Sequence, residues 1–256
     1  MGLSEQFAAA LAAETDEVDV HLLPDRLARA AARMLAVDGA GISALGGDSG
    51  RSPLGASSPD AARAERMQFT VGSGPCLQAH ESGRPVFVVE EDIRRRWPAF
   101  ADLLLSQTPF RGIVSLPLRS SLAGLSVGVG AMNLFFRDPG DVPRLDVFDA
   151  VAVGELVTSE LGDATVWSTW SMAAGPDWLN SPPALRRAAV WRAMGGISVA
   201  LDVSAQEALA LLRGYASADG RSVDAVAADV VSGRLGPADV VGPGGGRPGG
   251  GVRQGA

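Results

Sequence analysis

Few side chains in this 256-residue sequence could carry out catalysis or bind a metal ion. Cysteine occurs once, at Cys76, and histidine twice, at His21 and His80. A lone cysteine excludes a disulfide within the chain and a thiolate metal cage. The sequence also shows no catalytic triad, no phosphate-binding loop and no paired-carboxylate signature. We therefore expect no catalytic residue, no cofactor and no metal site, and we interpret both histidines as ordinary surface or core residues.

Aromatic residues on both sides of the cysteine are candidates for a ligand pocket, since small-molecule sites are concave and largely apolar. The alternative is that these side chains simply form hydrophobic core. A redox role for the thiol is disfavoured, because no arginine lies within five positions to lower its pKa. The candidate ligand-binding residues are Phe69, Cys76, Phe87, Trp97 and Phe100.

Two adjacent glycines, Gly195 and Gly196, fall inside a segment with helical periodicity. Each glycine inside a helix costs about 1 kcal/mol relative to alanine. A bare backbone permits close packing of another helix, and it equally permits close approach of another molecule. The sequence leaves both explanations open.

Composition and charge indicate a globular protein with two modules. Hydrophobic residues make up 46% of the chain, and no apolar run approaches the ~20 residues that a membrane helix needs. The N-terminal segment lacks the basic region of a secretory signal, so we expect a cytoplasmic protein. Residues 1–181 hold 14 arginines against 23 acidic residues, whereas residues 182–236 hold six against five. The second module is therefore less strongly repelled by a polyanion.

Hydrophobic periodicity predicts an α+β module over residues 1–165, with an antiparallel sheet flanked by helices. Segment 46–62 is rich in Gly, Ser and Pro and is expected to be a loop that runs into a short helix. A long amphipathic helix is expected to close the module after a polar turn that begins at residue 141. Other helices are predicted at 3–14, 24–37, 76–83 and 93–107, and strands at 39–45, 66–71, 84–90, 111–119 and 126–138.

The predicted linker, residues 166–183, contains Trp167, Trp170 and Trp178 together with Gly-Pro and Pro-Pro pairs. Exposed aromatic residues in a linker usually dock on a neighbouring surface. The chain ends in a glycine- and proline-rich tail, residues 237–256, which is expected to be disordered.

Residues 184–236 are predicted to form three short helices. Ser204 and Glu207 have the spacing of a capping box at the start of the second helix. Gly220 is expected to end that helix, and Ser222 to cap the third. The residues chosen for the core of this bundle are Leu185, Ala189, Val199, Leu209, Leu212, Val226 and Val230.

The segment MQFTVGSGPCLQAHESGRPVFVVE, residues 67–90, resembles part of the GAF sensor domain of actinobacterial regulators. In that domain a Gly-x-Gly-Pro-Cys run follows a strand, and the matching run here is 72–76. Outside this segment the resemblance rests on the order of the predicted elements. It implies a domain that senses a small-molecule or redox signal, whose identity the sequence does not give.

Residues 186–235 resemble the ANTAR domain, a three-helix RNA-binding module of transcription antiterminators. The match runs without gaps, with the small residues around Gly195 and the run EALALLRGYA in step. The resemblance implies a regulator that binds tandem stem-loops in nascent transcripts and so prevents terminator formation. Many members carry Gln and Lys where this chain has Arg192 and Met194. Arg192 can contact phosphate or stack on a base, but the cation at position 194 is lost.

The resemblance indicates that the glycine pair lies on an RNA-facing or helix-crossing surface, and the arginines and the tyrosine of the first two helices are further candidates for RNA contact. Guanidinium groups read looped bases by stacking and by forked hydrogen bonds, and a tyrosine ring can stack on a base. The alternatives are a solvated helix face for the arginines and a half-buried core position for the tyrosine. A balance of +1 attracts RNA weakly, which favours a dimer that presents two modules. The candidate RNA-binding residues are Arg187, Arg192, Gly195, Gly196, Arg213 and Tyr215.

Two rival functions stay open at this point. An enzyme with the same front fold, such as a free methionine sulfoxide reductase, normally uses several cysteines, and the single Cys76 disfavours it. Alternatively, the rear helices only dimerise the protein without binding RNA. The leading interpretation is a sensory antitermination regulator that forms a homodimer, with the long helix over residues 144–165 and the linker as the dimer seam. Its expected partners are RNA and an unidentified small molecule, without a membrane.

Overall fold

A computed structural model describes most of the chain and divides it into two compact units, Met1–Ala188 and Ala189–Ala256. His21, Trp178 and the low-complexity end of the tail lie outside the described residues. The described ranges are 2–14, 23–45, 51–122, 125–170 and 182–241.

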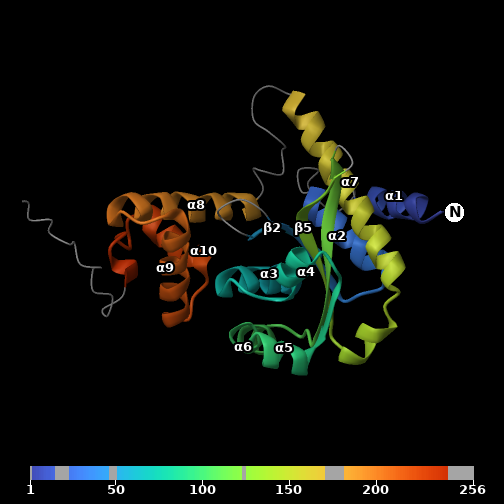
Figure 1. The fold of residues 1–256 in the computed structure, drawn as a ribbon, viewed down its shortest axis with the longest axis horizontal. Helices are drawn as coiled ribbons and strands as arrows, with labels where there is room; N and C mark the ends of the chain where they lie inside the picture. The colour runs from blue at the N-terminus through green and yellow to red at the C-terminus, as the bar shows by residue number, and fades with distance from the viewer. Residues whose placement is uncertain (1, 15–22, 46–50, 123–124, 171–181, 242–256) are drawn as a thin grey trace, which may run out of the picture. The chain divides into compact units, whose positions relative to one another are not determined.

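The first unit is an α+β fold built on a five-stranded antiparallel sheet with the strand order β2-β1-β5-β4-β3 (Figure 1). The strands are β1 (Gly39–Leu45), β2 (Arg51–Ala56), β3 (Val86–Val89), β4 (Gly112–Leu122) and β5 (Leu125–Phe136). The helices are α1 (Leu3–Ala13), α2 (Leu23–Met34), α3 (Pro59–Val71), α4 (Pro75–Ser82), α5 (Glu90–Arg96), α6 (Pro98–Gln107) and α7 (Val147–Trp170), with a 3-10 turn η1 (Pro139–Arg144) before α7.

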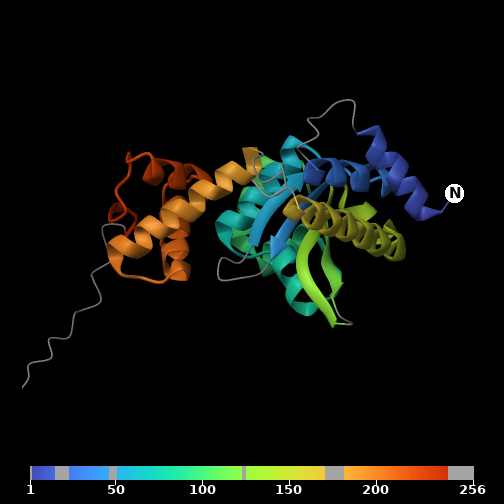
Figure 2. The same ribbon diagram turned by 90° about the horizontal axis from the view of Figure 1, so that it is seen from above.

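Helices cover both faces of the sheet and give it two hydrophobic cores. Helices α1, α2 and α7 lie on one face, and the helices from α3 to α6 lie on the other (Figures 1 and 2). The first core joins Leu27 and Val153 to sheet residues such as Ile42 and Leu116. The second joins Ile93, Phe100, Leu104, Phe110, Ile113 and Phe135, and the rings of Phe110 and Phe135 are stacked with centroids 4.8 Å apart.

The predicted helices at both ends of the module and four of the five predicted strands are confirmed. Segment 66–71 was wrongly predicted as a strand, because it is the second half of α3. The helix begins at Ser58, whose side chain accepts a hydrogen bond from the amide of Ala61, and it ends at Gly72 with a φ of 75°. Those two caps fix the helix over residues that alternate like a strand.

Within segment 46–62, residues 51–56 were wrongly predicted as loop, because they form the edge strand β2, whereas the helix expected at the end of the segment is the start of α3. Pro53 lies within this strand, and a proline is tolerated at a sheet edge because no neighbour needs its missing N–H. The register with β1 shifts between Ile42 and Ser43, which marks an irregularity in the pairing. Gly83 ends α4 with a φ of 64°, as predicted.

The second unit contains the helices α9 (Ala205–Ala218) and α10 (Val223–Val231), a 3-10 turn η3 (Asp239–Val241) and most of α8 (Pro182–Leu201). The predicted capping box is confirmed: Ser204 accepts a hydrogen bond from the amide of Glu207, whose carboxylate accepts one from the Ser204 amide. Ser222 caps α10 in the same way through the amide of Ala225.

The core of the second unit uses a different face of α8 from the one predicted. Leu185 and Val199 are 55% and 87% exposed, so their assignment to the core was wrong, and Ala189 is only half-buried. The predicted residues Leu209, Leu212, Val226 and Val230 are buried as expected. From α8 the core takes Val190, Ala193, Met194 and Ile197, which have the i, i+3, i+4, i+7 spacing of a single helix face.

The boundaries of the predicted linker and tail also change. Helix α7 continues to Trp170, so residues 166–170 are helical rather than linker. The first five residues of the predicted tail are ordered, since η3 packs on α9 and Val240 is buried. In the described part of the chain no single helix is long and apolar enough to cross a membrane; α8 and α9 satisfy that test only as a pair bent by 107°.

Candidate functional site

A buried polar cluster lies between the sheet and α3 in the first unit. Ser43, Ser115 and Asn133 come from β1, β4 and β5, and they meet Glu65 of α3 and Arg51 of β2. None of the five side chains is more than 1% exposed. We call these five residues the buried polar cluster.

Glu65 is the centre of the cluster. Its carboxylate accepts hydrogen bonds from the Ser43 hydroxyl and the Asn133 amide, both at 2.5 Å, and forms an ion pair with Arg51. Arg51 also donates to the Glu65 carbonyl oxygen at 2.6 Å, and Ser115 donates to the side-chain oxygen of Asn133 at 2.5 Å. A buried ion pair is tolerated when hydrogen bonds compensate for its desolvation, and here both carboxylate oxygens are bound.

The strand register explains how these groups meet. Asn133 lies directly opposite Ser115 on β4 and opposite Gly41 on β1. A Cβ atom at Gly41 would lie 2.5 Å from Glu65 Cγ and Oε1, so only glycine lets the carboxylate reach the sheet. The sequence carries a signal that we did not use: Ser43, Ser115 and Asn133 each interrupt an apolar strand.

Two buried donors beside this cluster have no acceptor among the described residues. They are Nε of Arg51 and Nε2 of Gln68. The side-chain oxygen of Gln68 is occupied, because it accepts a hydrogen bond from the Cys76 amide at 3.3 Å. A ligand that carries an acceptor oxygen would find two desolvated donors here, where hydrogen bonds are strong.

The five predicted pocket residues lie in different environments within the described part of the chain. Phe100 is fully buried and Trp97 half-buried in the second core, where the Arg96 guanidinium lies 4.6 Å from the Trp97 ring centroid. Phe87 is 40% exposed on the edge strand β3, because its neighbours on both sides point inward. Phe69 and Cys76 are fully buried. Their role in ligand binding stays a prediction.

The chemistry of Cys76 is set by its burial. Burial raises the pKa of its thiol to about 11, and nearby Arg51 only partly opposes this effect. The thiol is therefore protonated at neutral pH, and the thiolate is the reactive form of cysteine. This environment disfavours redox or nucleophilic chemistry at Cys76.

In the second unit, one exposed face of α8 carries several predicted RNA-binding residues. Arg192, Gly195 and Gly196 are exposed, and Val199 continues the same face at i+7 from Arg192. A Cβ atom at either glycine would meet nothing within 4 Å, so helix packing within the described chain does not require them. Arg192 is exposed and forms no ion pair with a described residue.

The other predicted RNA-binding residues lie in different environments. Arg187 is 5% exposed, and its guanidinium carbon lies 3.5 Å from the centroid of the Phe69 ring, a cation–π contact within the first unit. Arg213 and Tyr215 are half-buried on α9. Met194 is buried in the core at 4% exposure, which explains why an apolar residue suits this position.

Tyr215 lines a groove of about 390 Å³ between α9 and η3. An aromatic ring in the wall of an open groove can stack on an unpaired base. The remaining groove residues are small or apolar except for Asp219. The groove is formed by Ala210, Leu211, Gly214, Tyr215, Ala218, Asp219, Val240 and Val241.

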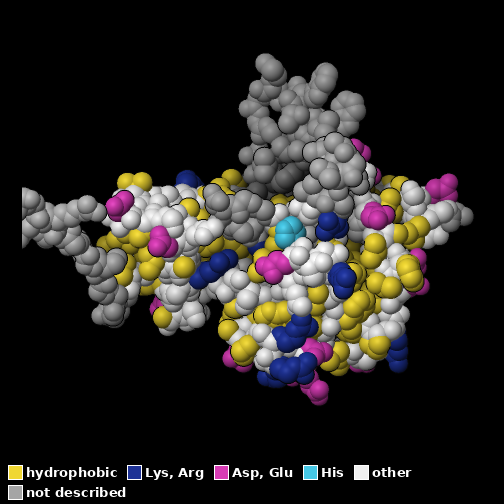
Figure 3. Space-filling model, in the orientation of Figure 1, with side chains coloured by type: hydrophobic (Ala, Val, Ile, Leu, Met, Phe, Trp, Pro, Cys, Tyr) yellow, Lys and Arg dark blue, Asp and Glu magenta, His cyan; other side chains and the backbone are white. Residues whose placement is uncertain are grey.

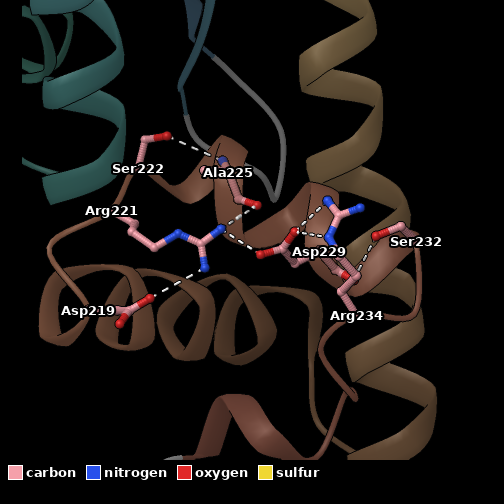
Figure 4. A network of polar contacts seen from close by, with 7 residues as sticks. All are labelled: Asp219, Arg221, Ser222, Ala225, Asp229, Ser232 and Arg234. Carbon is pink, nitrogen blue, oxygen red and sulfur yellow. Dashed lines mark hydrogen bonds and ion pairs between the residues drawn. The ribbon is translucent and has the colours of Figure 1, made fainter.

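Two arginines that we did not select have structural roles (Figure 4). Arg221 and Arg234 point toward Asp229 from opposite sides, with nitrogen–oxygen distances of 2.5 Å for each pair. Arg221 also donates to the carboxylate of Asp219 and to the Ala225 carbonyl, each at 3.3 Å. The hydrogen bonds from Arg221 and Arg234 to its carboxylate hold the pKa of Asp229 below its ordinary value. The network ties the end of α9 to α10.

Charged side chains are mixed by sign over the surface seen in Figure 3. In the first unit they gather over α5, where Arg94 pairs with Glu90 and Arg95 with Asp92. The visible face of the second unit carries few charges, with acidic and basic groups interspersed. Among the described residues, no group of three or more His, Cys, Asp or Glu side chains could hold a metal ion.

No protein-family model matches the chain, and no curated protein matches it significantly. Among solved structures, the chain is similar to GAF domains of two phosphoenolpyruvate-protein phosphotransferases. For the Acinetobacter domain the identity is 10%, the TM-score 0.42, and the match covers 66% of this chain and 95% of that one. For the Coxiella burnetii domain the values are 11%, 0.42, 65% and 98%.

The chromophore-binding domain of a Stigmatella aurantiaca bacteriophytochrome is also similar, at 12% identity and a TM-score of 0.34. This match covers 62% of this chain and 60% of that one. With TM-scores of 0.42 or lower, the description of the fold rests on the sheet order and helix layers themselves.

Proposed function

We propose that this protein is a sensory regulator, with a GAF-type first unit that binds a small molecule and an ANTAR-type second unit that binds looped RNA. Binding to tandem stem-loops in a nascent transcript would act as antitermination. The resemblance of residues 186–235 to ANTAR domains and of residues 67–90 to GAF domains supports this proposal.

The observation that carries the proposal is the open backbone at Gly195 and Gly196. Two helix-interior glycines cost about 2 kcal/mol relative to alanine, and no described neighbour needs the space. Close approach of another molecule to this face of the helix would explain why glycine occurs at both positions. Arg192 lies on the same face, one turn away, and supplies a planar cation that suits phosphate and stacked bases.

We further propose that the protein acts as a homodimer through α7. Phe148 is 83% exposed and Val151, one turn further along the helix, is 37% exposed. Single exposed apolar side chains are common, but two on one helix face form a small patch that a second copy can cover. A dimer presents two RNA-binding units, and their combined avidity compensates for the weak positive charge of each.

In the first unit, the site proposed for sensing lies beside the buried polar cluster. The donors of Arg51 and Gln68 suit a ligand that carries a carbonyl or carboxylate oxygen. Protonation of the Cys76 thiol favours this sensing role over a thiol-dependent reductase.

The test measures binding of the 256-residue chain to an RNA with two adjacent stem-loops by fluorescence anisotropy at low salt. Arg192→Ala is expected to weaken binding about tenfold, which corresponds to about 1.4 kcal/mol and lies within the range of one stacking contact. Arg144→Ala, at an exposed site in the first unit, is the matched control and should bind like the wild type. Absence of saturable binding, or equal affinity of both variants, would refute RNA recognition by this face.

A further inference from the structure

A cavity of about 290 Å³ lies in the first unit between the sheet and α7, and Ser43 is the member of the buried polar cluster that lines it. Its walls come from β1, β2, β4 and β5 on one side and from α7 on the other. Ile42 and Leu118, which belong to the core under α7, form part of its floor. It shares none of the predicted pocket residues Phe69, Cys76, Phe87, Trp97 and Phe100.

The lining of this cavity is apolar and uncharged among the described residues. Leu54, Val129 and Leu161 extend the apolar surface, while Ser120 and Thr158 provide hydroxyl groups. Thr158 already donates its proton to the Gly154 carbonyl at 2.8 Å, so its oxygen is left as an acceptor. No described lining residue carries a charge that could pair with an ionic group on the ligand, so the site favours an uncharged ligand.

Small residues create the free volume. Ala44 and Gly130 face each other in the β1–β5 pair, and a Cβ atom at Gly130 would lie 2.3 Å from the Ser43 carbonyl oxygen. Gly162 lines the cavity from α7. A larger side chain at Ala44 would fill part of this space, whereas position 130 needs glycine because of its close approach to the β1 backbone.

We propose that this cavity binds a small, uncharged, largely apolar molecule with one hydrogen-bond donor. A dry apolar cavity of roughly 150 Å³ holds benzene, so a volume of about 290 Å³ suits a molecule of bicyclic size. The hydroxyl of Thr158 accepts the donor, and the leucine and isoleucine side chains bury the rest of the ligand.

The position of the cavity makes α7 the element that responds to the ligand. The bound molecule touches both the sheet and α7, the helix that continues along the chain toward the second unit. A ligand that fits one arrangement of α7 better than another shifts the balance between them by its difference in affinity. This regulatory role rests on the proposed function, whereas the binding site itself does not.

The experiment uses the whole 256-residue chain with indole, a neutral bicyclic molecule with one N–H donor, and with indole-3-acetate as a charged counterpart. Binding is measured by NMR titration and by the shift in melting temperature. Ala44→Leu fills the cavity from β1, and Leu161→Phe fills it from α7. Ala9→Leu adds the same three carbons as Ala44→Leu at an exposed position of α1 and is the matched control.

Saturable binding of indole by the wild type and Ala9→Leu is expected, without binding of indole-3-acetate. Both filled variants should bind indole at least about tenfold more weakly, a change of about 1.4 kcal/mol; Leu161→Phe gives the result if Ala44→Leu does not fold. No saturable indole binding by the wild type, or undiminished affinity in the filled variants, overturns the site. RNA affinity measured on the same samples tests the proposed function separately, because either binding event can fail without the other.

Discussion

At the scale of single residues, replacing the glycine pair of α8 is expected to change folding stability and RNA affinity in opposite directions. The double variant Gly195→Ala, Gly196→Ala places methyl groups in open space and removes the conformational freedom of two glycines. The second unit is expected to become more stable by about 1 kcal/mol per substitution. RNA affinity is expected to fall, because the added methyl groups hold the RNA backbone away from the helix.

Urea unfolding, followed by NMR signals of α8, measures the stability, and anisotropy with tandem stem-loop RNA measures the affinity. Gly162→Ala is the matched control, since α7 of the first unit carries this helix-interior glycine at an equally open position outside the RNA-binding unit. A double variant that is stabilised and still binds RNA like the wild type would show that the glycines have no part in RNA recognition.

The carboxylate of Asp229 makes the link between α9 and α10 dependent on pH. Hydrogen bonds from Arg221 and Arg234 lower its pKa in the folded protein, whereas an unfolded aspartate titrates near about 3.9. A lowered folded pKa means that the stabilisation is complete above the unfolded pKa and is lost as the pH falls through the folded value. The wild type should therefore exceed Asp229→Asn in stability at pH 6, and the difference should shrink toward pH 3.

Thermal unfolding followed by the methyl signals of α10 checks this pH dependence. Asp202→Asn, an exposed carboxylate outside the network, should change stability equally at both pH values. A constant gap between the wild type and Asp229→Asn from pH 6 to pH 3 would contradict the role of the ion pairs.

Prediction from the sequence succeeded for the capping residues, which depend on contacts a few residues apart. It failed for the core of α8, which depends on which face of the helix is buried. The capping residues Ser204 and Ser222 were identified because their hydrogen bonds reach only three residues along the chain. Leu185 and Val199 were placed in the core because they are apolar, yet α8 buries the face of Met194 and Ile197. Alanines and glycines occur all around this helix, so its sequence marks the buried face weakly.

At the scale of elements, the close fit of α3 on β1 depends on one glycine. Gly41→Ala would place a methyl group 2.5 Å from two Glu65 atoms and push the carboxylate away from Asn133 and Ser43. Because the ion pair with Arg51 is fully buried, loss of its hydrogen bonds leaves charge without compensation. We expect the first unit to lose about 3 kcal/mol of stability, by analogy with other broken buried polar networks.

Urea denaturation measured on NMR signals of β4 and β5 tests this fit. Gly162→Ala is the control, because an added methyl group there meets nothing within 4 Å. A urea unfolding curve for Gly41→Ala that coincides with the wild-type curve would show that α3 can shift on the sheet without loss of stability.

The wrongly predicted elements, β2 and the end of α3, share a physical cause. The run 66–71 alternates like a strand, but its caps at Ser58 and Gly72 belong to a helix that began earlier in the chain. Segment 51–56 forms a strand because it pairs with the edge of β1. Arg51 also holds it in place by a hydrogen bond to Glu65, 14 residues later in the chain. Both outcomes depend on tertiary contacts, which local propensity does not contain.

At the scale of the whole molecule, the charge asymmetry between the two parts of the chain was visible in the sequence, whereas the cavity was not. A count of arginines and acids needs no structure, whereas Ile42, Leu118 and Thr158 lie far apart in sequence and meet only after folding. The order of helices and strands predicted the antiparallel sheet, because most of its strands are hydrophobic runs between turn residues.

The charge distribution also predicts how RNA binding responds to salt. The chain carries a net charge of −7, so long-range attraction of RNA is absent and binding depends on a few local arginines. Each phosphate contact with single-stranded RNA contributes about −0.7 to the slope of log K against log salt. If Arg192 and Arg213 each contact one phosphate in both copies, a dimer makes four contacts and should show a slope of about −3.

Arg192→Ala distinguishes a dimer from a monomer in the same measurement. In a dimer the substitution removes one contact from each copy, so the slope should become shallower by about 1.4, and in a monomer by about 0.7. Phe148→Glu places a charge in the exposed patch of α7 and is expected to yield monomers. In that background Arg192→Ala should change the slope by the smaller amount, because one RNA-binding unit then acts alone. If the slope of the wild type does not respond to Arg192→Ala in either background, the phosphates are held by other residues and α8 does not face the RNA.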